Sequence, residues 1–425
     1  MKGIEGIKVV ELAGYVAGPA CPRILAEMGA TVYKIEPFSG DEYRTNAPGF
    51  QMDRTDIDDP AFDLASMNKE WISVNLKTPE GKEFVYKLLE EADVLMTNYR
   101  NTALKKLGFD WETIHERFPG IIWAQMRGYG EYGPMANAKG FDATAYSARG
   151  GLFASIPQFD EHYAPGNVPP AFGDWNAAIA LTAGILGAIV RRDRCGEGDK
   201  VTVNLYHMAC WGFQTGLAGV QFRDQWPKSR KHIACPTNNS FHSSDGVWFI
   251  MCYGSYNIFY NHVMKFIGRE DLIDDPRYFP QENMDYDTTA EIIQIIEDAF
   301  AQKTWEEWQP IFKENDVPVE KINTLKDVLA DEEVYSSDIL RPLPYDEFGK
   351  KSLTTSPIRL GSVGDPVLYR SRPIGYDTKR IMEEHGYTNS QIKELVDAGA
   401  VKCYDGPALP DAVTAPSYGR IKPIL

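Results

Sequence analysis

Asp174 is the residue of this sequence whose setting best suits nucleophilic chemistry. It stands in the stretch "FGDWN", directly before the Ala-rich part of a strongly apolar helix that we expect over residues 174–192. An Asp before such a helix usually caps the first turn by accepting backbone N–H bonds, and that ordinary role is the first interpretation. A nucleophilic role is compatible with it, because a helix N-terminus lowers the pKa of a carboxylate and keeps it ionised.

A second group of candidates stands in a loop and at strand ends. The loop contains Tyr15, Val16 and Ala17, and the basic and polar residues are Lys77, Asn98, Arg100, Lys106 and Lys139. Ligands of open α/β sheets bind at the carboxyl ends of the strands, where we place Lys77 and Asn98. The alternative is plain: the loop is only a tight turn, and the lysines are solvated surface charges.

Cysteines and histidines offer no metal site. The six cysteines include no CxxC pair, and the seven histidines show no HxxxH or HExxH spacing. The cysteines are therefore interpreted as reduced thiols, and no metal is expected. His207 and Cys210 stand on an apolar run, which favours a core position over a Cys-His catalytic pair.

Composition restricts the class of protein. A chain of 425 residues favours two domains. The net charge of −16, with no long Lys/Arg run, makes nucleic acid and anionic membrane surfaces poor partners. The sequence has no 18-residue apolar run, and its first residues lack the apolar core of a signal peptide, so we expect a cytoplasmic protein.

The elements that must position these residues alternate between strands and helices. The first segment has a βαβ pattern, with "IKVVEL" and "TVYKIE" as strands around the helical "ACPRILAEMG". Its loop lacks the Gly-x-Gly-x-x-Gly fingerprint, which argues against NAD. We predict a parallel α/β layer over 1–200, a linker at 201–225, a smaller α+β domain over 226–330, and a linker with a return to the large domain over 331–425.

Several motifs occur in an order that resembles one known family. They are "GIKVVELAGYVAGPACPRILAEMGATVYKIEP", "NLKTPEGK", "ADVLMTNYR", "LGFD", "GYGEYGP", "KGFDATAYSARGG", "GDWNAA" and "GDKVTVNLYHMA". Together they resemble the class III coenzyme A transferases, which include formyl-CoA:oxalate and carnitine CoA-transferases. The likeness is closest to the branch that activates 2-hydroxy acids such as phenyllactate or 2-hydroxyisocaproate in amino-acid-fermenting anaerobes.

The resemblance implies a mechanism and an architecture. Asp174 would form a mixed anhydride with the acyl group of an acyl-CoA donor, then an aspartyl-CoA thioester, and a carboxylic acid acceptor would leave as its CoA ester. The fold would be α/β, a Rossmann-like large domain formed by the N-terminal part and the C-terminal segment, with a smaller α+β domain inserted. Relatives form interlocked homodimers.

The resemblance also implies where CoA binds. Matching positions, together with Arg100, are Tyr15, Val16, Ala17, Leu76, Lys77, Asn98, Tyr99, Lys106, Leu107, Lys139 and Phe141. This sequence departs from the oxalate enzymes, because Pro37 and Lys106 replace arginines, Val16 replaces a glutamine, and a glycine-run loop is missing. Oxalate is therefore not the expected acceptor, and we expect an aryl- or alkyl-substituted 2-hydroxy or 2-enoic acid.

Two other functions stay open. The α-methylacyl-CoA racemases share the fold and use a His/Asp pair, but Phe141 stands where the racemase has its His, and it cannot carry a proton. The second alternative is a non-catalytic CoA-binding protein in which Asp174 is a plain helix cap.

Overall fold

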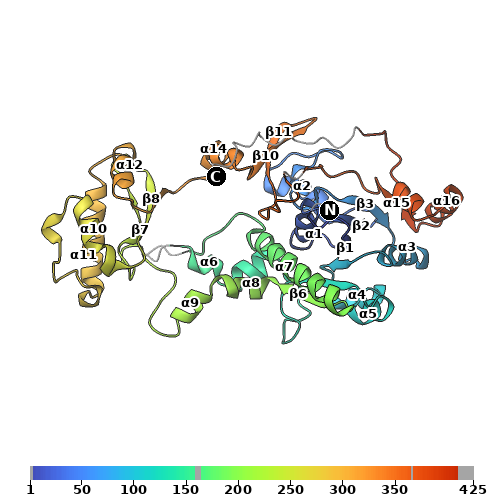
Figure 1. Cartoon of the computed structure of the whole chain (residues 1–425), viewed down its shortest axis with the longest axis horizontal. Coiled ribbons are helices and arrows are strands. Elements are labelled where there is room, and N and C mark those ends of the chain that lie inside the picture. Colours follow the sequence, from blue (N-terminus) through green and yellow to red (C-terminus); the bar gives the residue numbers. More distant parts are fainter. Residues whose placement is uncertain (1–2, 158–163, 365–366, 410–425) are drawn as a thin grey trace. The chain divides into compact units, whose positions relative to one another are not determined.

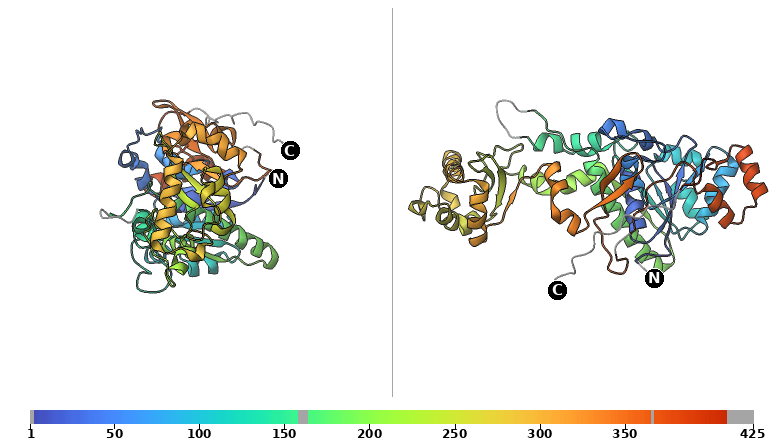
Figure 2. Two further views of the ribbon diagram at one scale, coloured as in Figure 1. Left: turned by 90° about the vertical axis from the view of Figure 1, so that its left-hand side faces the viewer. Right: turned by 90° about the horizontal axis from the view of Figure 1, so that it is seen from above.

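The structure of the chain is a computed structural model that describes residues 3–157, 164–364 and 367–409 (Figures 1 and 2). It divides into two compact units. The large unit comprises 1–152, 168–214 and 331–425, and the small unit comprises 153–167 and 215–330. Residues 410–425, the end of the predicted return segment, lie outside the described residues.

A seven-stranded sheet forms the centre of the large unit. Its strands, in sheet order, are β12 (Val401–Lys402), β3 (Glu70–Val74), β2 (Thr31–Glu36), β1 (Lys8–Leu12), β4 (Val94–Thr97), β5 (Ile122–Arg127) and β6 (Lys200–Asn204). All neighbours pair in parallel except β12, which pairs antiparallel with β3. The order β3-β2-β1-β4-β5-β6 is that of doubly wound nucleotide-binding folds, so the predicted parallel α/β core is confirmed.

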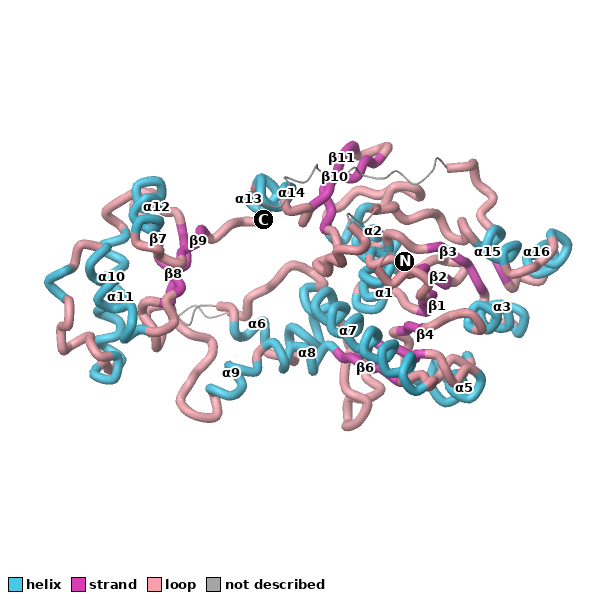
Figure 3. The backbone as a smooth tube through the Cα atoms, viewed as in Figure 1, coloured by secondary structure: helices cyan, strands magenta, loops and turns pink. Residues whose placement is uncertain are grey.

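Helices cover both faces of this sheet (Figure 3). Successive residues of a strand point to opposite faces, and Val9 and Val10 of β1 accordingly enter different cores. On the first face lie α1 (Ala17–Glu27) and α7 (Phe172–Cys195); on the second lie α3 (Pro79–Leu89), α4 (Asn101–Leu107), α5 (Trp111–Arg117), α15 (Thr378–Glu384) and α16 (Asn389–Asp397). Near-continuous apolar strands, as in "IKVVEL", are what burial on both faces requires.

Shorter elements complete the large unit. They are α2 (Pro60–Ser66), a π-helix at Asp142–Ala148, α8 (Leu205–Gly212), α14 (Glu332–Ser336) and the antiparallel pair β10 (Leu340–Tyr345) and β11 (Gly349–Thr354). The helix α6 (Leu152–Ser155) spans the sequence boundary between the units. By length and composition α7 is apolar enough to cross a membrane, but Leu181 and Ile185 on it are fully buried in the core of the first face.

The small unit has its own core. A three-stranded antiparallel sheet of β7 (Asn238–His242), β8 (Trp248–Cys252) and β9 (Val319–Lys321) packs with helices around an aromatic cluster that includes Phe249, Phe300 and Trp308. The helices of this core are α10 (Tyr256–Phe266), α11 (Tyr286–Phe300) and α12 (Trp305–Glu314), whereas α9 (Gln214–Gly219) and α13 (Leu325–Ala330) bury no residue.

Candidate active site

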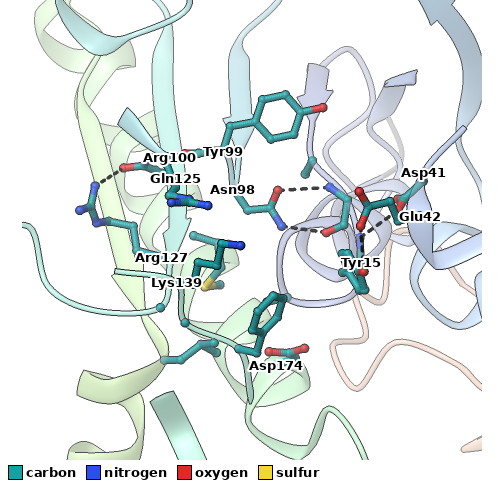
Figure 4. Close-up of a pocket in the computed structure, with 18 of the residues that line it drawn as sticks. Tyr15, Asp41, Glu42, Asn98, Tyr99, Arg100, Gln125, Arg127, Lys139 and Asp174 are labelled. Carbon is teal, nitrogen blue, oxygen red and sulfur yellow. Dashed lines mark hydrogen bonds between the residues drawn. The ribbon is translucent and has the colours of Figure 1, made fainter. Parts of the chain in front are cut away.

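A cavity of about 520 Å³ lies in the large unit at the carboxyl ends of β1, β2, β4 and β5. Its walls come from the loops that follow these strands, at residues 13–17, 36–42, 98–101 and 127–141, together with Asp174 (Figure 4). This is the place where open α/β sheets bind ligands, because the strand ends and helix N-termini converge there.

The cavity brings together most of the predicted site residues. Eight of them line it: Tyr15, Ala17, Asn98, Tyr99, Arg100, Lys139, Phe141 and Asp174.

Five predicted residues do not line this cavity. Val16 is buried in a cluster with Phe62 and Trp71. Leu76 and Leu107 pack against the core of the second sheet face. Lys77 and Lys106 are exposed.

Asp174 does not cap helix α7, which corrects the first interpretation of the sequence. The helix begins at Phe172, two residues earlier than predicted, and follows Ala171, whose φ of 64° is left-handed. Asp174 is therefore the third residue of the helix. The capping acceptor is Asp142, which accepts the N–H of Gly173 over 2.6 Å and also receives backbone N–H groups of Ala171 and Asp174.

The ionisation of Asp174 also differs from the expectation. Burial is the largest cause that raises the pKa of Asp174, the charge of Asp142 adds to it, and a hydrogen bond from the N–H of Ala17 opposes both, so that the pKa is about 8. Removal from water therefore outweighs the helix end in this setting, since an isolated carboxylate loses more hydration energy than a helix N-terminus returns. The carboxyl group is half-buried and lies at the cavity wall.

The loop that offers the Ala17 N–H is fixed by Asn98. The amide of Asn98 exchanges two hydrogen bonds with Gly14, from Gly14 N at 3.2 Å and to Gly14 O at 2.7 Å (Figure 4). Gly18 completes this contact, because a Cβ there would lie 2.9 Å from the Asn98 amide carbon. Asn98 thus sets the position of the first turn of α1.

Tyr15 is held on the other side of the same loop. Its φ of 63° is left-handed, an uncommon conformation for a residue with a side chain. Its N–H donates to Asp41 at 3.0 Å, and its hydroxyl donates to Glu42 at 2.8 Å. The conformation is therefore maintained by carboxylates of the loop after β2.

A chain of buried charges lies behind this loop, and the sequence analysis did not find it. Lys34 Nζ lies 2.8 Å from Asp41 and 2.9 Å from Glu11, and Lys69 Nζ lies 2.7 Å from the second oxygen of Glu11. Burial would raise the pKa of Asp41, but Lys34 and backbone N–H groups outweigh it and lower that pKa. Burial lowers the pKa of Lys69 to about 8.

Arg127 is another cavity residue that the sequence analysis missed. It is the last residue of β5, directly before the turn Gly128-Tyr129, so its place at a strand end was the available signal. In the described part of the chain, no group of His, Cys, Asp and Glu side chains is arranged to hold a metal ion.

The comparisons with known proteins identify the family. The model of CoA-transferase family III matches residues 4–378. This chain belongs to CoA-transferase family III. It is therefore a class III CoA-transferase.

Two curated relatives place this class III CoA-transferase more narrowly. The chain is 37% identical over 394 residues to cinnamoyl-CoA:phenyllactate CoA-transferase from Clostridium sporogenes, covering 92% of this chain and 95% of the relative. It is 35% identical over 399 residues to (R)-2-hydroxy-4-methylpentanoate CoA-transferase from Clostridioides difficile, covering 94% of this chain and 99% of the relative. The predicted family and branch are thus confirmed.

Solved structures show the same fold. A mutant form of Rv3272 from Mycobacterium tuberculosis superposes with a TM-score of 0.76 at 23% identity, covering 90% of this chain and 98% of that one. A CAIB/BAIF family protein from Brucella suis superposes with a TM-score of 0.72 at 25% identity, covering 91% and 100%.

Proposed function

We propose that Asp174 is the nucleophile of CoA transfer. Its ionised carboxylate attacks the donor thioester carbonyl, which forms a mixed anhydride and releases CoA thiolate. The thiolate attacks the aspartyl carbonyl, which forms an aspartyl-CoA thioester and releases the donor acid. The acceptor carboxylate then attacks this thioester, which forms a second mixed anhydride between Asp174 and the acceptor and releases CoA thiolate again. The thiolate finally takes the acceptor acyl group and frees Asp174.

The observation that supports this role is the position of the Asp174 carboxyl. It lies at the wall of the cavity, it is half-buried, and the Ala17 N–H binds it. A hydrogen bond to one carboxylate oxygen leaves the other free to attack. Partial burial also limits water, which would hydrolyse the anhydride and the aspartyl thioester. A carboxylate is required because an anhydride, unlike a serine ester, conserves the energy of the thioester.

The same proposal gives CoA its contacts. Along the cavity its binding residues are Tyr15, Ala17, Asn98, Tyr99, Arg100, Lys139 and Phe141. CoA is long, so its remaining part would extend to the more distant group of Leu76, Lys77, Lys106 and Leu107. The side chain of Val16, between Tyr15 and Ala17, is buried, so this residue would contribute through its backbone. No metal and no NAD are part of the proposed reaction.

For the acceptor we propose a 2-hydroxy or 2-enoic acid with an aryl or branched alkyl substituent. The names of the two curated relatives give acids of this class as substrates of those enzymes. Apolar aromatic surface is available at the cavity, where the Tyr15 and Phe141 rings lie 6.1 Å apart and 54% of Phe141 is exposed. A panel in which only small dicarboxylates accept CoA would contradict this substrate class.

We also propose a biological setting. The small unit is an inserted α+β domain, the enzyme is a cytoplasmic homodimer, and it acts in anaerobic amino-acid fermentation. Large exposed apolar side chains at Trp211 (63%) and Phe222 (86%) support burial in a second copy of the chain. Sedimentation of the purified enzyme at the mass of one chain would refute the dimer.

Covalent trapping tests the nucleophile. The enzyme is incubated in turn with cinnamoyl-, acetyl- and succinyl-CoA, hydroxylamine is added, and the modified peptide is mapped by mass spectrometry. A hydroxamate on Asp174 is expected, and none in the Asp174→Asn variant. Proton exchange beside the thioester without any adduct would instead support the racemase alternative. CoA binding with neither signal would support a non-catalytic CoA-binding protein.

A further inference from the structure

Arg127 presents a guanidinium to the cavity that is oriented only by neutral groups. It donates to Asn101 Oδ1 and Gln125 Oε1, each at 3.0 Å. It also donates to the carbonyl oxygens of Ala136 at 2.7 Å and Tyr129 at 3.3 Å. These bonds fix the plane of the guanidinium without neutralising its charge.

The positive charge of Arg127 is left uncompensated. Within the described residues no carboxylate forms an ion pair with Arg127. Burial lowers the pKa of Arg127, the charge of Glu131 opposes this, and Glu131 is itself paired with Lys200 at 2.5 Å. An arginine keeps its proton under these conditions, so the cavity contains a fixed, unpaired cation.

Two more cations line the same cavity. Arg100 and Lys139 are exposed at its wall, and neither forms an ion pair with any part of the chain that the structure describes. Of the cavity acids, Asp41 binds Lys34 and Glu36 binds Arg44, whereas Glu42 is exposed and accepts the Tyr15 hydroxyl, and none of the three pairs with a cavity cation. In a chain of net charge −16, a cavity with three unpaired cations indicates a ligand with several negative charges.

We propose that Arg127, together with Arg100 and Lys139, binds phosphate groups of CoA. The proposal rests on the proposed function, in which CoA enters this cavity. The planar fork of an arginine matches phosphate oxygens, and CoA carries several such charges. The acceptor acid carries one carboxylate, which must reach the aspartyl carbonyl of Asp174.

The hydrogen bonds that Arg127 donates to neighbouring groups also hold its guanidinium in place before a ligand binds. They join Arg127 to both sides of the loop 128–140, whose ends meet at two glycines: a Cβ on Gly128 would lie 2.5 Å from Gly140 Cα. Lys139 stands directly before that contact. Binding therefore requires little ordering of the loop or of the Arg127 side chain, which spares conformational entropy.

The test measures affinity for CoA and for two shortened forms. Calorimetry compares CoA, 3′-dephospho-CoA and phosphate-free pantetheine on the unaltered enzyme and on Arg127→Gln and Arg127→Lys. Arg194→Gln is the matched control, because Arg194 is exposed, lies outside the cavity and changes the net charge equally. Circular dichroism checks that each variant is folded.

We expect Arg127→Gln to weaken CoA at least about tenfold, since a hydrogen bond between charged groups is being lost. Pantetheine affinity should be unchanged. The CoA affinity of Arg127→Lys should lie between that of the unaltered enzyme and that of Arg127→Gln. If Arg127→Gln is unfolded, the selective loss of CoA affinity in Arg127→Lys decides the matter in the same way. Comparison with 3′-dephospho-CoA then shows which phosphate Arg127 contacts.

Three results would overturn the assignment. Equal weakening of CoA and pantetheine would make Arg127 only a clamp of the loop. An unchanged CoA affinity with a raised KM for the acceptor would make it a carboxylate ligand. Absence of CoA binding and of the Asp174 hydroxamate in the unaltered enzyme would overturn the proposed function as well. With the hydroxamate present, only the Arg127 assignment would fall.

Discussion

The carboxylate of Asp142 caps the helix that bears Asp174. Its Oδ1 accepts the N–H of Gly173 over 2.6 Å, although the two residues are 31 positions apart in the sequence. The cap anchors the first turn of α7 to the segment after Phe141. It also places a second carboxylate beside the proposed nucleophile and so influences its ionisation.

The pKa of Asp174 predicts a pH dependence of the first half-reaction. With a pKa of about 8, only about a tenth of the free enzyme has an ionised Asp174 at pH 7. Because the carboxylate is the attacking form in the proposed mechanism, the rate of aspartyl-CoA formation should rise through about pH 8. Rapid-quench kinetics from pH 6 to 9 checks this, and a flat profile would contradict it.

The same shift predicts a stability difference for Asp174→Asn. The folded pKa lies above the unfolded value near 4, so the folded state binds the proton more tightly. The native enzyme therefore loses stability as the pH rises from about 4 to about 8, and the variant is spared this loss. Its Tm should equal that of the native enzyme at pH 4 and exceed it at pH 9. Exposed Asp287→Asn is the control and should show no such divergence.

Substitution of Asp142 separates its cap from its charge. Asp142→Asn keeps an acceptor for the Gly173 N–H but removes the charge that raises the pKa of Asp174. The pH profile of the first half-reaction should therefore move to lower pH. Asp142→Ala also removes the cap and should lower the free energy of unfolding by about 1–2 kcal/mol.

The pH profile reports on Asp174 only if its titratable neighbours do not change charge over the same pH range. Tyr43 is affected by the charges of Asp59, Asp174 and Asp41, and burial already raises its pKa above the tested range. It should not titrate between pH 6 and 9. An unchanged profile in Asp142→Asn would show that the charge of Asp142 has no part in the ionisation of Asp174.

Gly173→Ala should disable the site through packing. A Cβ there would lie 2.2 Å from the Tyr146 ring and 2.7 Å from Asp142 Oδ1. We expect a loss of about 1–3 kcal/mol in unfolding free energy and a large loss of transfer rate, because Asp174 must shift. Gly187→Ala on the same helix meets nothing within 4 Å and should leave the rate unchanged. Equal effects of the two variants would refute the packing argument.

Lys34→Met should be strongly destabilising. It leaves the buried Asp41 and Glu11 carboxylates without the ammonium that now lies 2.8 and 2.9 Å away. Removing one partner of a buried ion pair costs about 3–5 kcal/mol, which urea unfolding would measure at pH 7. The exposed Lys105→Met is the control, with an expected change below about 0.5 kcal/mol.

The sequence predicts the sheet better than it predicts the environment of Asp174. Strands such as "IKVVEL" reveal themselves because burial on both faces demands unbroken apolar runs. The Asp142 cap depends on a hydrogen bond between residues 31 positions apart in the sequence, and no local pattern predicts it. The local sequence "TVYKIE" likewise does not indicate whether Lys34 is exposed or, as in this structure, fully buried between two acids.

The packing of α1 against α7 holds one part of the cavity rigidly, whereas the loops that line the rest of it can change in sequence. Asp174 and the Ala17 N–H that binds it belong to two helices packed in one core, whereas most other cavity residues belong to loops. We therefore expect exchange of a cavity loop residue to alter which acid is accommodated without moving the proposed reacting carboxyl. We expect new substrate preferences to arise by single substitutions in these loops, while the proposed chemistry stays with the core.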